Sequence, residues 1–371
     1  MDSRGISPVV GVLLITGITV ILGAVVLSVF GSIETENVSP DVVWETQTGD
    51  FETGIIVEHI GGDKVSIDNI EVQGAVVVEK PTNDINAGSE IVYYPTNERV
   101  QITWGEEDTT AIIYEEQFDL ESLYFSYTLD KETGDITEAD GVEFDGAIRA
   151  ETGGIDFSTD DGKEVFIGGS AVANEEVEFD NGGLLVGSVI SESDDVTLNS
   201  IEVIRDVESG DTATIKDESL VQENVSADDT VVLTGDSTVR GEVDAGDDVQ
   251  IKEGSTAEGS ITANTVDLNN ATVEAGIDTD GEIDIDSNST VNGDITAGGD
   301  VDADNDSIIS GDIIADGDVD ADDDSIISGD IIADGDVDIE QGVVVKGDVI
   351  ASGTVDVTGE VEGEICEGCE V

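Results

Sequence analysis

The sequence predicts a mainly β protein that begins with a transmembrane helix and continues with a β-sandwich and then a β-solenoid. Three observations predict this class: a long uncharged apolar segment near the N-terminus, short runs of alternating apolar residues after it, and a repeat of about 18 residues in the C-terminal half. The expected boundaries are residues 6–33 for the helix, 40–118 for the sandwich and 177–371 for the solenoid, which should contain about eleven coils.

The charge of the chain is its strongest compositional feature. Asp and Glu number 88 against 12 Lys and Arg, so the formal net charge is −76 over 371 residues. At molar ionic strength the Debye length falls to about 3 Å, which screens the self-repulsion of such a chain and favours a protein of an extreme halophile. Hydrophobic residues make up 38% and recur at a fixed spacing, which distinguishes the chain from a disordered acidic tail. The few, scattered basic residues exclude a nucleic-acid partner.

The N-terminal apolar segment predicts a membrane anchor. No charged residue occurs between Ile6 and Ile33, and Val9 to Phe30 form a near-continuous apolar run of about 22 residues. A helix of that length crosses a hydrocarbon core of about 30 Å. Ser7 can cap the start of the helix, and Pro8 fits its first turn.

A candidate processing site lies before the apolar run, whereas an ordinary secretory signal is cut after it. The segment from Arg4 to Leu14 reads Arg-Gly-Ile-Ser-Pro-Val-Val-Gly-Val-Leu-Leu and resembles the start of archaeal type IV pilins. The resemblance implies that residues 1–5 are a prepilin-type leader, that a prepilin peptidase cuts after Gly5, and that Ile6 begins the mature helix. In that family the helix anchors the free subunit and packs into the filament core. A plain signal anchor is the alternative interpretation.

The resemblance to the pilin family continues past the helix. Ile55 to Asp63, followed by Val65 to Ile67, are similar to the family's strand, Gly-Gly-Asp turn and next strand, and Val100 to Trp104 are similar to its late strand. The resemblance covers about residues 1–118, roughly a third of the chain.

Period-two alternation predicts seven short strands in the sandwich. The predicted runs are Asp41–Glu45, Gly54–Ile60, Val65–Ile70, Val76–Val78, Ile91–Tyr94, Val100–Trp104 and Ala111–Tyr114. His59, the one histidine, is interpreted as structural rather than as a ligand or base. Residues 119–176 continue with less regular strands and are either an irregular β region or entry coils of the solenoid.

The C-terminal half repeats with a period of about 18 residues. Val301, Val319, Val337 and Val355 open successive units, and further units at similar spacings reach back to Val177. The apolar slots alternate in period two, which predicts coils with strands on two faces, stacked so that their inward residues form one aliphatic column. Glycines that recur between the last two slots should point inward, where the chain crowds the axis. These glycines are Gly311, Gly329 and Gly347.

The repeat resembles bactofilins, which are polymer-forming β-helical proteins. The segments that carry the resemblance are Gly347 to Val357 and Val355 to Ile365, where Gly-Asp-Val or Val-Asp-Val triplets recur. The similarity is one of architecture over about half of the chain, and it implies polymerisation of the solenoids as an alternative to a filament built on the helix.

Six further aliphatic residues lie just outside the core slots in the last three full units. By strand alternation they should face outward and form a self-association stripe, unless these coils turn their corners differently and bury them. The six are Ile308, Ile314, Ile326, Ile332, Val344 and Ile350.

The remaining candidate sites suit a secreted chain. Cys366 and Cys369 predict a local or intersubunit disulfide, because a tetrahedral zinc site needs four ligands. Asn-x-Ser/Thr motifs predict N-glycosylation. The candidate asparagines are Asn37, Asn224, Asn270, Asn288 and Asn305.

Catalytic and cofactor signatures are absent from the sequence. One histidine excludes a two-histidine metal motif, and no phosphate-binding Gly-Lys-Ser/Thr loop occurs. Asp-rich corners at Asp302 to Asp306 and Asp316 to Asp318 could offer oxygen ligands to calcium, but none matches the full calcium-loop pattern. We therefore expect no enzyme activity, no cofactor and no dedicated metal site.

These features together predict a membrane-anchored surface protein, with most of the chain outside the cell. The expected role is a pilin-like structural subunit whose solenoid serves adhesion or assembly, and the expected partners are a prepilin peptidase, the membrane, and copies of itself or other pilins. The first alternative is a signal-anchored, bactofilin-like scaffold that polymerises. The second is a solenoid hydrolase acting on surface polysaccharide, which would need acids gathered in one cleft.

Overall fold

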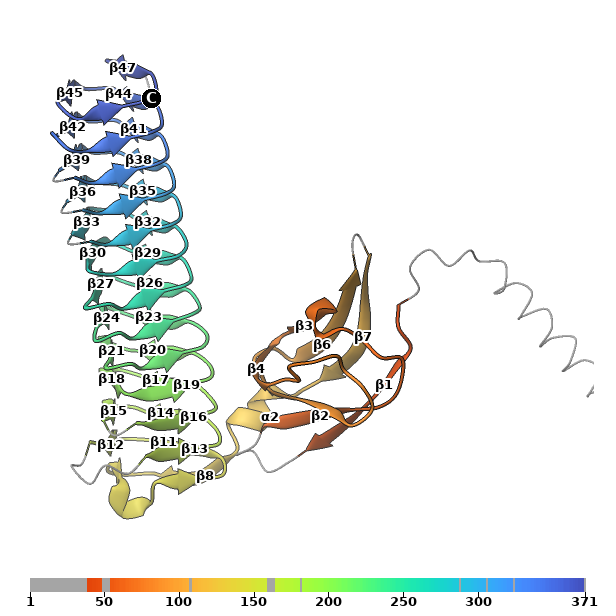
Figure 1. Cartoon of the computed structure of the whole chain (residues 1–371). Helices are drawn as coiled ribbons and strands as arrows, with labels where there is room; N and C mark the ends of the chain where they lie inside the picture. The colour runs from red at the N-terminus through yellow and green to blue at the C-terminus, as the bar shows by residue number, and fades with distance from the viewer. Residues whose placement is uncertain are drawn as a thin grey trace, which may run out of the picture.

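The computed structural model describes residues 39–48, 54–106, 109–158, 164–180, 182–286, 288–304, 306–322 and 324–369. They form a small β-sandwich and a long β-solenoid, and the sandwich lies beside the lower part of the rod (Figure 1). None of the helices in these ranges is long and apolar enough to cross a membrane. The predicted membrane helix, residues 6–33, lies outside the described residues.

Seven antiparallel strands make the sandwich. One sheet has the order β1-β2-β5-β4 and the other β3-β6-β7. Between them lies a core that includes Val57, Ile91 and Ile102, all at most 1% exposed. The strands are β1 Val42–Thr48, β2 Ile55–Gly62, β3 Ile70–Gln73, β4 Ala75–Glu79, β5 Ser89–Pro95, β6 Arg99–Glu106 and β7 Thr109–Gln117.

The third predicted strand, Val65 to Ile70, is wrong. The structure has a 3₁₀ turn at η2 Ile67–Asn69, and β3 begins only at Ile70. The turn includes Asp68 and Asn69, whose side chains favour local turns over a strand ladder. Val65 makes only a single bridge to Ile85.

The Gly-Gly-Asp turn after β2 closes the sheet against the start of β1. Gly62 has φ +103°, and a Cβ at this position would lie 2.0 Å from the backbone oxygen of Asp41. The backbone N–H of Asp63 donates to that oxygen at 2.7 Å, and the carboxylate of Asp63 accepts from the N–H of Asp41 at 3.0 Å. Glycine is therefore required at position 62 by both conformation and space.

A short helix links the sandwich to the solenoid. Helix α2, Leu120–Tyr124, is capped by the carboxylate of Asp119, which accepts from the N–H of Ser122 at 3.2 Å. The first solenoid strand follows at once, so the region between the sandwich and residue 177 is built mainly of coils. A second 3₁₀ turn, η3 Glu138–Asp140, lies within the first coil.

Three parallel sheets form the sides of the solenoid, and each is named here by its first strand. The β8 sheet contains β8 Tyr127–Lys131, β11 Ala147–Ala150, β14 Ala171–Ala173, β17 Val189–Ser191, β20 Val207–Ser209, β23 Val225–Ala227, β26 Val243–Ala245, β29 Ile261–Ala263, β32 Ile277–Thr279, β35 Ile295–Ala297, β38 Ile313–Ala315, β41 Ile331–Ala333, β44 Val349–Ala351 and β47 Ile365–Glu367. The β9 sheet contains β9 Ile136–Thr137, β12 Ile155–Phe157, β15 Val177–Phe179, β18 Val196–Asn199, β21 Ala213–Lys216, β24 Val231–Leu233, β27 Asp248–Lys252, β30 Thr265–Asn269, β33 Ile283–Asp286, β36 Val301–Ala303, β39 Val319–Ala321, β42 Val337–Ile339 and β45 Val355–Val357. The β10 sheet contains β10 Glu143–Phe144, β13 Val165–Ile167, β16 Gly183–Leu185, β19 Ile201–Val203, β22 Leu220–Val221, β25 Thr238–Val239, β28 Thr256–Ala257, β31 Thr272–Val273, β34 Thr290–Val291, β37 Ile308–Ile309, β40 Ile326–Ile327, β43 Val344–Val345 and β46 Glu360–Val361.

The described part of the chain thus makes about 13 coils on three faces, whereas the repeat in the sequence predicts about eleven coils on two. The additional coils come from residues before Val177, for which the sequence left two alternatives open, an irregular β region or entry coils of the solenoid. At about 4.8 Å per coil the rod is about 60 Å long.

The recurrent glycines do not point inward as expected. Gly311, Gly329 and Gly347 lie at the corner between the β10 sheet and the β8 sheet, so the run that was interpreted as one strand is two. A Cβ on Gly329 would lie 2.2 Å from the backbone oxygen of Gly311 one coil below. The glycine is required by close stacking of successive corners.

Each strand buries alternate residues. In β36 and β39, Val301, Ala303, Val319 and Ala321 are fully buried, while the aspartates between them face out. These inward residues belong to one continuous aliphatic cluster that runs through the coils. A single coil could not bury them alone, so each coil is stabilised by its neighbours.

Two corners are built by polar residues. At the corner from the β9 sheet to the β10 sheet, Asn288, Asp306 and Asp324 adopt positive φ of 63–64°, a conformation that Asn and Asp tolerate. At the corner from the β10 sheet to the β8 sheet, the carboxylate of each aspartate accepts the backbone N–H of the next coil: Asp330 donates to Asp312 at 2.8 Å, and Asp348 to Asp330 at 2.7 Å. These carboxylates thus satisfy backbone donors that the sheets leave unpaired.

Strand β40 offers a matched test of this alternation. Ile327 is fully buried, whereas its neighbour Ile326 faces outward and is half-buried. We expect Ile327→Ala to lower the free energy of unfolding by about 2–5 kcal/mol and Ile326→Ala by less than about 1 kcal/mol, measured by denaturant titration of the full chain in molar salt. Equal losses from the two variants would contradict the assigned alternation.

Candidate interaction surfaces

Several predicted site residues lie outside the described residues. These are the cleavage-site residues Arg4, Gly5 and Ile6 and the sequon asparagines Asn37 and Asn305. The other candidate residues are placed by the structure, and they fall on distinct surfaces of the solenoid.

The sandwich is docked on the base of the solenoid through a buried apolar cluster. Tyr94 of β5 and Tyr124 of α2 pack against Val186 and Ile204, and all four residues are at most 3% exposed. Val186 and Ile204 directly follow β16 and β19 on the outer side of the β10 sheet. Apolar side chains there would face water if the sandwich did not cover them.

Polar contacts surround this junction. The hydroxyl of Tyr124 donates to the backbone oxygen of Pro95 at 2.9 Å, and the guanidinium of Arg205 lies 5.3 Å from the centre of the Tyr124 ring. Burial raises the pKa of Tyr124, so its hydroxyl stays protonated and remains a donor. Burial also raises the pKa of Glu223, which hydrogen-bonds to Thr96 of the sandwich. The junction therefore combines apolar packing with specific hydrogen bonds.

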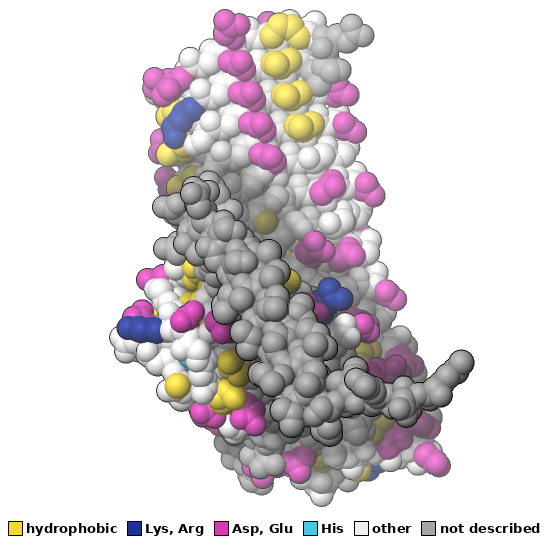
Figure 2. All heavy atoms as spheres, turned by 90° about the vertical axis from the view of Figure 1, so that its right-hand side faces the viewer, with side chains coloured by type: hydrophobic (Ala, Val, Ile, Leu, Met, Phe, Trp, Pro, Cys, Tyr) yellow, Lys and Arg dark blue, Asp and Glu magenta, His cyan; other side chains and the backbone are white. Residues whose placement is uncertain are grey.

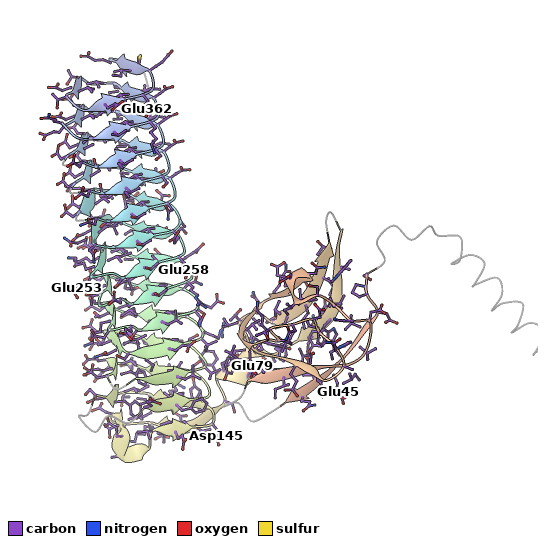
Figure 3. All side chains as sticks on the ribbon, in the orientation of Figure 1. Glu45, Glu79, Asp145, Glu253, Glu258 and Glu362 are labelled. Carbon is purple, nitrogen blue, oxygen red and sulfur yellow. A yellow bond between two sulfur atoms is a disulfide. The ribbon has the colours of Figure 1, made fainter. Side chains whose placement is uncertain are left out.

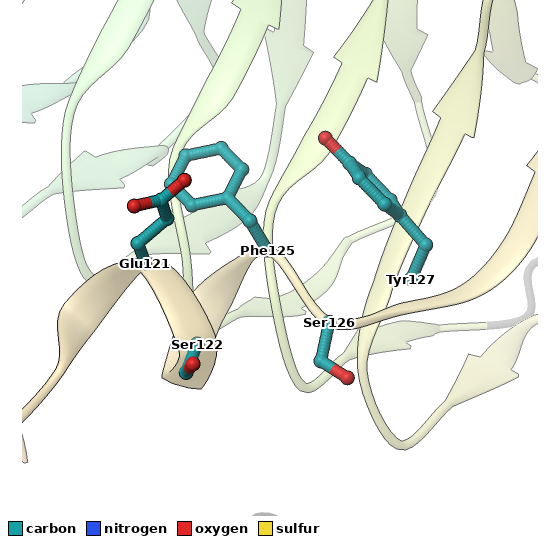
Figure 4. A pocket seen from close by; sticks show the side chains of 5 residues that line it. All are labelled: Glu121, Ser122, Phe125, Ser126 and Tyr127. Carbon is teal, nitrogen blue, oxygen red and sulfur yellow. The ribbon is translucent and has the colours of Figure 1, made fainter.

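An open hollow of about 730 Å³ lies beside the junction, where α2 meets β8 (Figure 4). It is lined by Glu121, Ser122, Phe125, Ser126 and Tyr127. The rings of Phe125 and Tyr127 stand on its two sides, and Phe125 also packs against the junction cluster. The single acid in this lining, Glu121, has no second carboxylate beside it in the hollow with which to act as an acid–base pair.

The predicted stripe residues all face outward, in two columns on different faces. Ile308, Ile326 and Val344 succeed one another on the β10 sheet, and Ile314, Ile332 and Ile350 on the β8 sheet. Ile308 is 41% and Ile314 44% exposed, and the other four are half-buried. Between the columns runs the corner of Asp312, Asp330 and Asp348, and Figure 2 shows hydrophobic side chains beside acidic columns near the upper end of the rod.

Acidic side chains such as Glu253, Glu258 and Glu362 project from the rod (Figure 3), and aspartates form a continuous column on the β9 sheet. Six aspartates pair in register, one in each successive coil: Asp267, Asp284, Asp302, Asp320, Asp338 and Asp356. Partial burial, followed by repulsion from Asp320 and Asp284, raises the pKa of Asp302 to about 6. Burial and neighbouring acids also raise the pKa of Asp284 and of Asp320. Lys252 pairs with the first member, Asp267, at 2.8 Å.

Two groups of carboxylates are close enough to share a cation. One is Glu282, Asp284 and Asp302, and the other is Asp194, Asp195 and Asp211. Carboxylate oxygens are the ligands that calcium prefers. Asp302 comes from one of the two Asp-rich corners singled out in the sequence, whereas Asp316 and Asp318 join neither group.

The cysteines and the remaining sequons lie on the surface of the solenoid. Cys366 and Cys369 are joined in a disulfide whose Cα atoms are 5.9 Å apart. Asn270 and Asn288 are exposed at positive-φ corners. Asn224 is also exposed, but its amide donates to Asp206 at 3.1 Å and its oxygen accepts the N–H of Glu242 at 2.8 Å. A glycan on Asn224 would compete with these corner contacts.

His59 lies in the sandwich core and is 1% exposed. Its ring is 5.3 Å from that of Trp44, and neither ring nitrogen has a hydrogen-bond partner among the described residues. No acid or nucleophile within the described part of the chain hydrogen-bonds to it, as a catalytic base would require.

The start of the chain is similar to a known protein family. Residues 4–43 match the family model described as archaeal type IV pilin, N-terminal. An uncharacterized protein of Archaeoglobus fulgidus is 39% identical to this chain over 74 residues, which are 19% of this chain and 52% of that protein. The chain thus spans about half the length of this relative. The chain is thus similar to archaeal type IV pilins over residues 4–43, and its described residues include a β-solenoid of about 13 coils.

The docking of the sandwich can be tested at Ile204. We expect Ile204→Asp to detach the sandwich from the rod, because it places a carboxylate in a fully buried apolar contact. Small-angle X-ray scattering in molar salt should show a larger radius of gyration, with unchanged circular dichroism. Glu258→Asp, an exposed change three coils higher in the same row, is the control. A radius unchanged by Ile204→Asp would show that other contacts hold the sandwich.

The aspartate column predicts a dependence of stability on pH. The folded-state pKa of Asp302 is raised above the usual value. The contribution of this carboxyl group to the free energy of unfolding is therefore fully present below about pH 4 and is lost as the pH rises through about 6. In dilute buffer at pH 7, Asp302→Asn should therefore raise the free energy of unfolding, by several tenths of a kcal/mol after solvent screening. The gain should shrink at pH 4 and in molar salt.

Thermal unfolding at the two pH values and the two salt concentrations measures this effect. Asp356→Asn, at the exposed end of the same column, is the matched control and should have a smaller effect. If Asp302→Asn destabilised the protein at pH 7, the carboxylate would instead have a favourable partner, such as a bound cation.

Proposed function

We propose that this chain is a membrane-anchored, extracellular type IV pilin-like structural subunit whose solenoid extends from the surface for adhesion or assembly. The match of residues 4–43 to the archaeal pilin N-terminal family is the observation that carries the proposal. In such a subunit the uncharged segment from Ile6 to Ile33 anchors the chain and the leader is removed by a prepilin peptidase.

The arrangement of the described residues supports a structural role. The sandwich follows the anchor directly and is packed against the base of the rod, so that the rod is held by folded structure rather than by a flexible linker. The outer faces of the rod present repeated columns of side chains, which suit contacts that are made many times along a surface. The acidic surface suits a salt-rich medium, where repulsion is screened.

Processing at the N-terminus tests the proposal. In a host with a prepilin peptidase, N-terminal sequencing of the mature protein should begin at Ile6. Arg4→Ala and Gly5→Leu should leave the leader attached, because by the resemblance to pilins the peptidase recognises a charged residue before the small one at the cut. Ser3→Ala, which changes the leader outside that pair, is the matched control and should be processed normally.

The alternative, a signal-anchored polymer-forming scaffold, predicts a different outcome. It retains Met1 or Asp2, and its mature mass is unchanged by Arg4→Ala and by Gly5→Leu. That result would exclude the pilin pathway while leaving a membrane-anchored scaffold in place.

A further inference from the structure

The outward row of the β10 sheet changes its chemistry along the rod. Near the base the row contains Phe166, Leu184 and Leu220, interrupted by Glu202. It continues in four threonines and becomes aliphatic again in three successive coils near the tip. In order, the later members are Thr238, Thr256, Thr272, Thr290, Ile308, Ile326 and Val344.

At the base, the apolar part of this row is covered. Phe166 and Leu184 pack against the junction cluster, where the sandwich docks. At the tip, no described part of the chain covers the aliphatic members, and Ile308 is 41% exposed. Within this one molecule the outward row is thus apolar where a β-sandwich covers it, threonine-rich in the middle, and apolar again at the tip. The tip is therefore the second position at which a partner is expected.

The neighbouring face adds a second column at the same height. On the β8 sheet, Thr296 is followed by Ile314, Ile332 and Ile350, and Ile314 is 44% exposed. The two columns, hereafter the apolar columns, occupy the same three coils and have their middle members, Ile326 and Ile332, in the same coil.

One basic residue lies beside the apolar columns. Lys346 is the only Lys or Arg in residues 253–371, and it is exposed. Its Nζ donates to the hydroxyl of Ser328 at 3.1 Å, which places it in the uppermost of the three coils, next to the aspartate corner. In the lowest of these coils the position equivalent to Lys346 is Ser310, followed by Asp312.

We propose that the apolar columns bind the same surface of a second copy of this chain, with the two rods antiparallel. A two-fold axis along the strands of the β10 sheet at Ile326 sets Ile308 opposite Val344 of the second copy and Ile326 opposite its counterpart. The same axis brings the two aspartate corners to one side, where Lys346 of each copy faces Ser310 and Asp312 of the other. The β8-sheet columns of the two copies then lie on that side as well. A two-fold axis along parallel rods separates the β8-sheet columns and moves Lys346 away from Asp312.

The size of the contact predicts its strength. The six aliphatic side chains span only about 10 Å from the first coil to the third, so the area that they bury is well below the roughly 800 Å² per partner that a stable interface buries. The two copies of Asp330 also approach each other, which opposes binding unless salt screens them. The contact is therefore weak, forms in molar salt, and gains strength when many rods meet at once.

This inference deepens the proposed function. The contact between two rods does not depend on that function, whereas the role of the contact between two facing membranes rests on it. Antiparallel rods have their anchored ends pointing in opposite directions, so the contact joins copies held on two facing surfaces. The ligand for adhesion is then the protein itself, presented by a second cell.

The first test is the oligomeric state of the purified full chain in detergent and molar salt, measured by sedimentation over a range of concentrations. We expect a monomer–dimer equilibrium that the triple variant Ile308→Thr, Ile326→Thr, Val344→Thr weakens at least about tenfold, with unchanged circular dichroism. The matched control changes Thr238, Thr256 and Thr272 of the same row to Ser and should dimerise normally. A wild-type chain that stays monomeric, or a dimer that the triple variant leaves intact, would overturn the proposal.

The second test uses charge and does not depend on the fold of the triple variant. Lys346→Glu should weaken the dimer, because it faces the acidic corner of the second copy, and adding Ser310→Lys to the same chain should restore it. Both side chains are exposed, so neither change should alter folding. Failure of Ser310→Lys to rescue Lys346→Glu would exclude the antiparallel register.

Crosslinking of variants with one added cysteine decides the register directly, because Cys366 and Cys369 are already joined in a disulfide. Ile326→Cys should crosslink to itself, and a mixture of Ile308→Cys and Val344→Cys should give mixed dimers. Self-crosslinking of Ile308→Cys would instead show parallel rods.

Vesicles that carry the reconstituted full chain separate this inference from the proposed function. Clustering of such vesicles in molar salt, lost in the triple variant, supports adhesion between facing membranes. Dimers in detergent without vesicle clustering would uphold the contact and refute its role between membranes. Failure of leader processing would refute the pilin pathway and leave the contact standing.

Discussion

In-register stacking of one coil on the next is the constraint on which the rest of the structure depends. Parallel backbone hydrogen bonds on three sheets hold each residue above its equivalent one coil below, as Val301 lies below Val319 and Val319 below Val337. The register tolerates units of different length, since the pairing of Thr256 with Thr272 closes a shorter coil than the pairing of Val177 with Val196. The corners accommodate the different numbers of residues per coil. They do so because a slip of one residue within a strand would turn its aliphatic side chains from the core to the surface.

The same register decides the character of the surface. Any residue repeated in the sequence becomes a column on the rod, so similar side chains are placed about 4.8 Å apart whether or not they attract one another. Aliphatic columns are stabilised by this arrangement, whereas the aspartate column of the β9 sheet is destabilised by it, since partial burial and then repulsion from neighbouring aspartates raise the pKa of Asp302. The corner aspartates differ from this column, because Asp312 and Asp330 each accept a backbone N–H of the next coil.

Local patterns in the sequence were sufficient to predict much of the solenoid. The period of two identified which residues of each strand face inward, and it correctly assigned Ile308 and Ile314 to the outside. It did not reveal the third face, because the turn at Ser310, Gly311 and Asp312 is too short to interrupt the alternation visibly. The first coils were predicted only as one of two alternatives for residues 119–176, since their inward residues include Phe157 and Phe179 and their repeat is irregular.

The junction with the sandwich is a contact between distant segments, and no local pattern predicts which segments meet. A signal was nevertheless present. Val186 and Ile204 are apolar at positions where the later coils have Ser310, Ser328 and Lys346, and such an exception to the repeat marks a covered surface. Tyr124 and Arg205 could not have been paired from the sequence, because their contact depends on how the sandwich is seated.

The stacking of similar coils has a consequence for how such a chain changes over generations. Residues 300–317 and 318–335 are identical except that Asn305 is replaced by Asp323, as expected of a recent tandem duplication. Since each coil contacts only its neighbours, copying or deleting one repeat lengthens or shortens the rod by about 4.8 Å and leaves all other contacts intact. The length of the rod can therefore change in single-coil steps, without a new fold having to evolve.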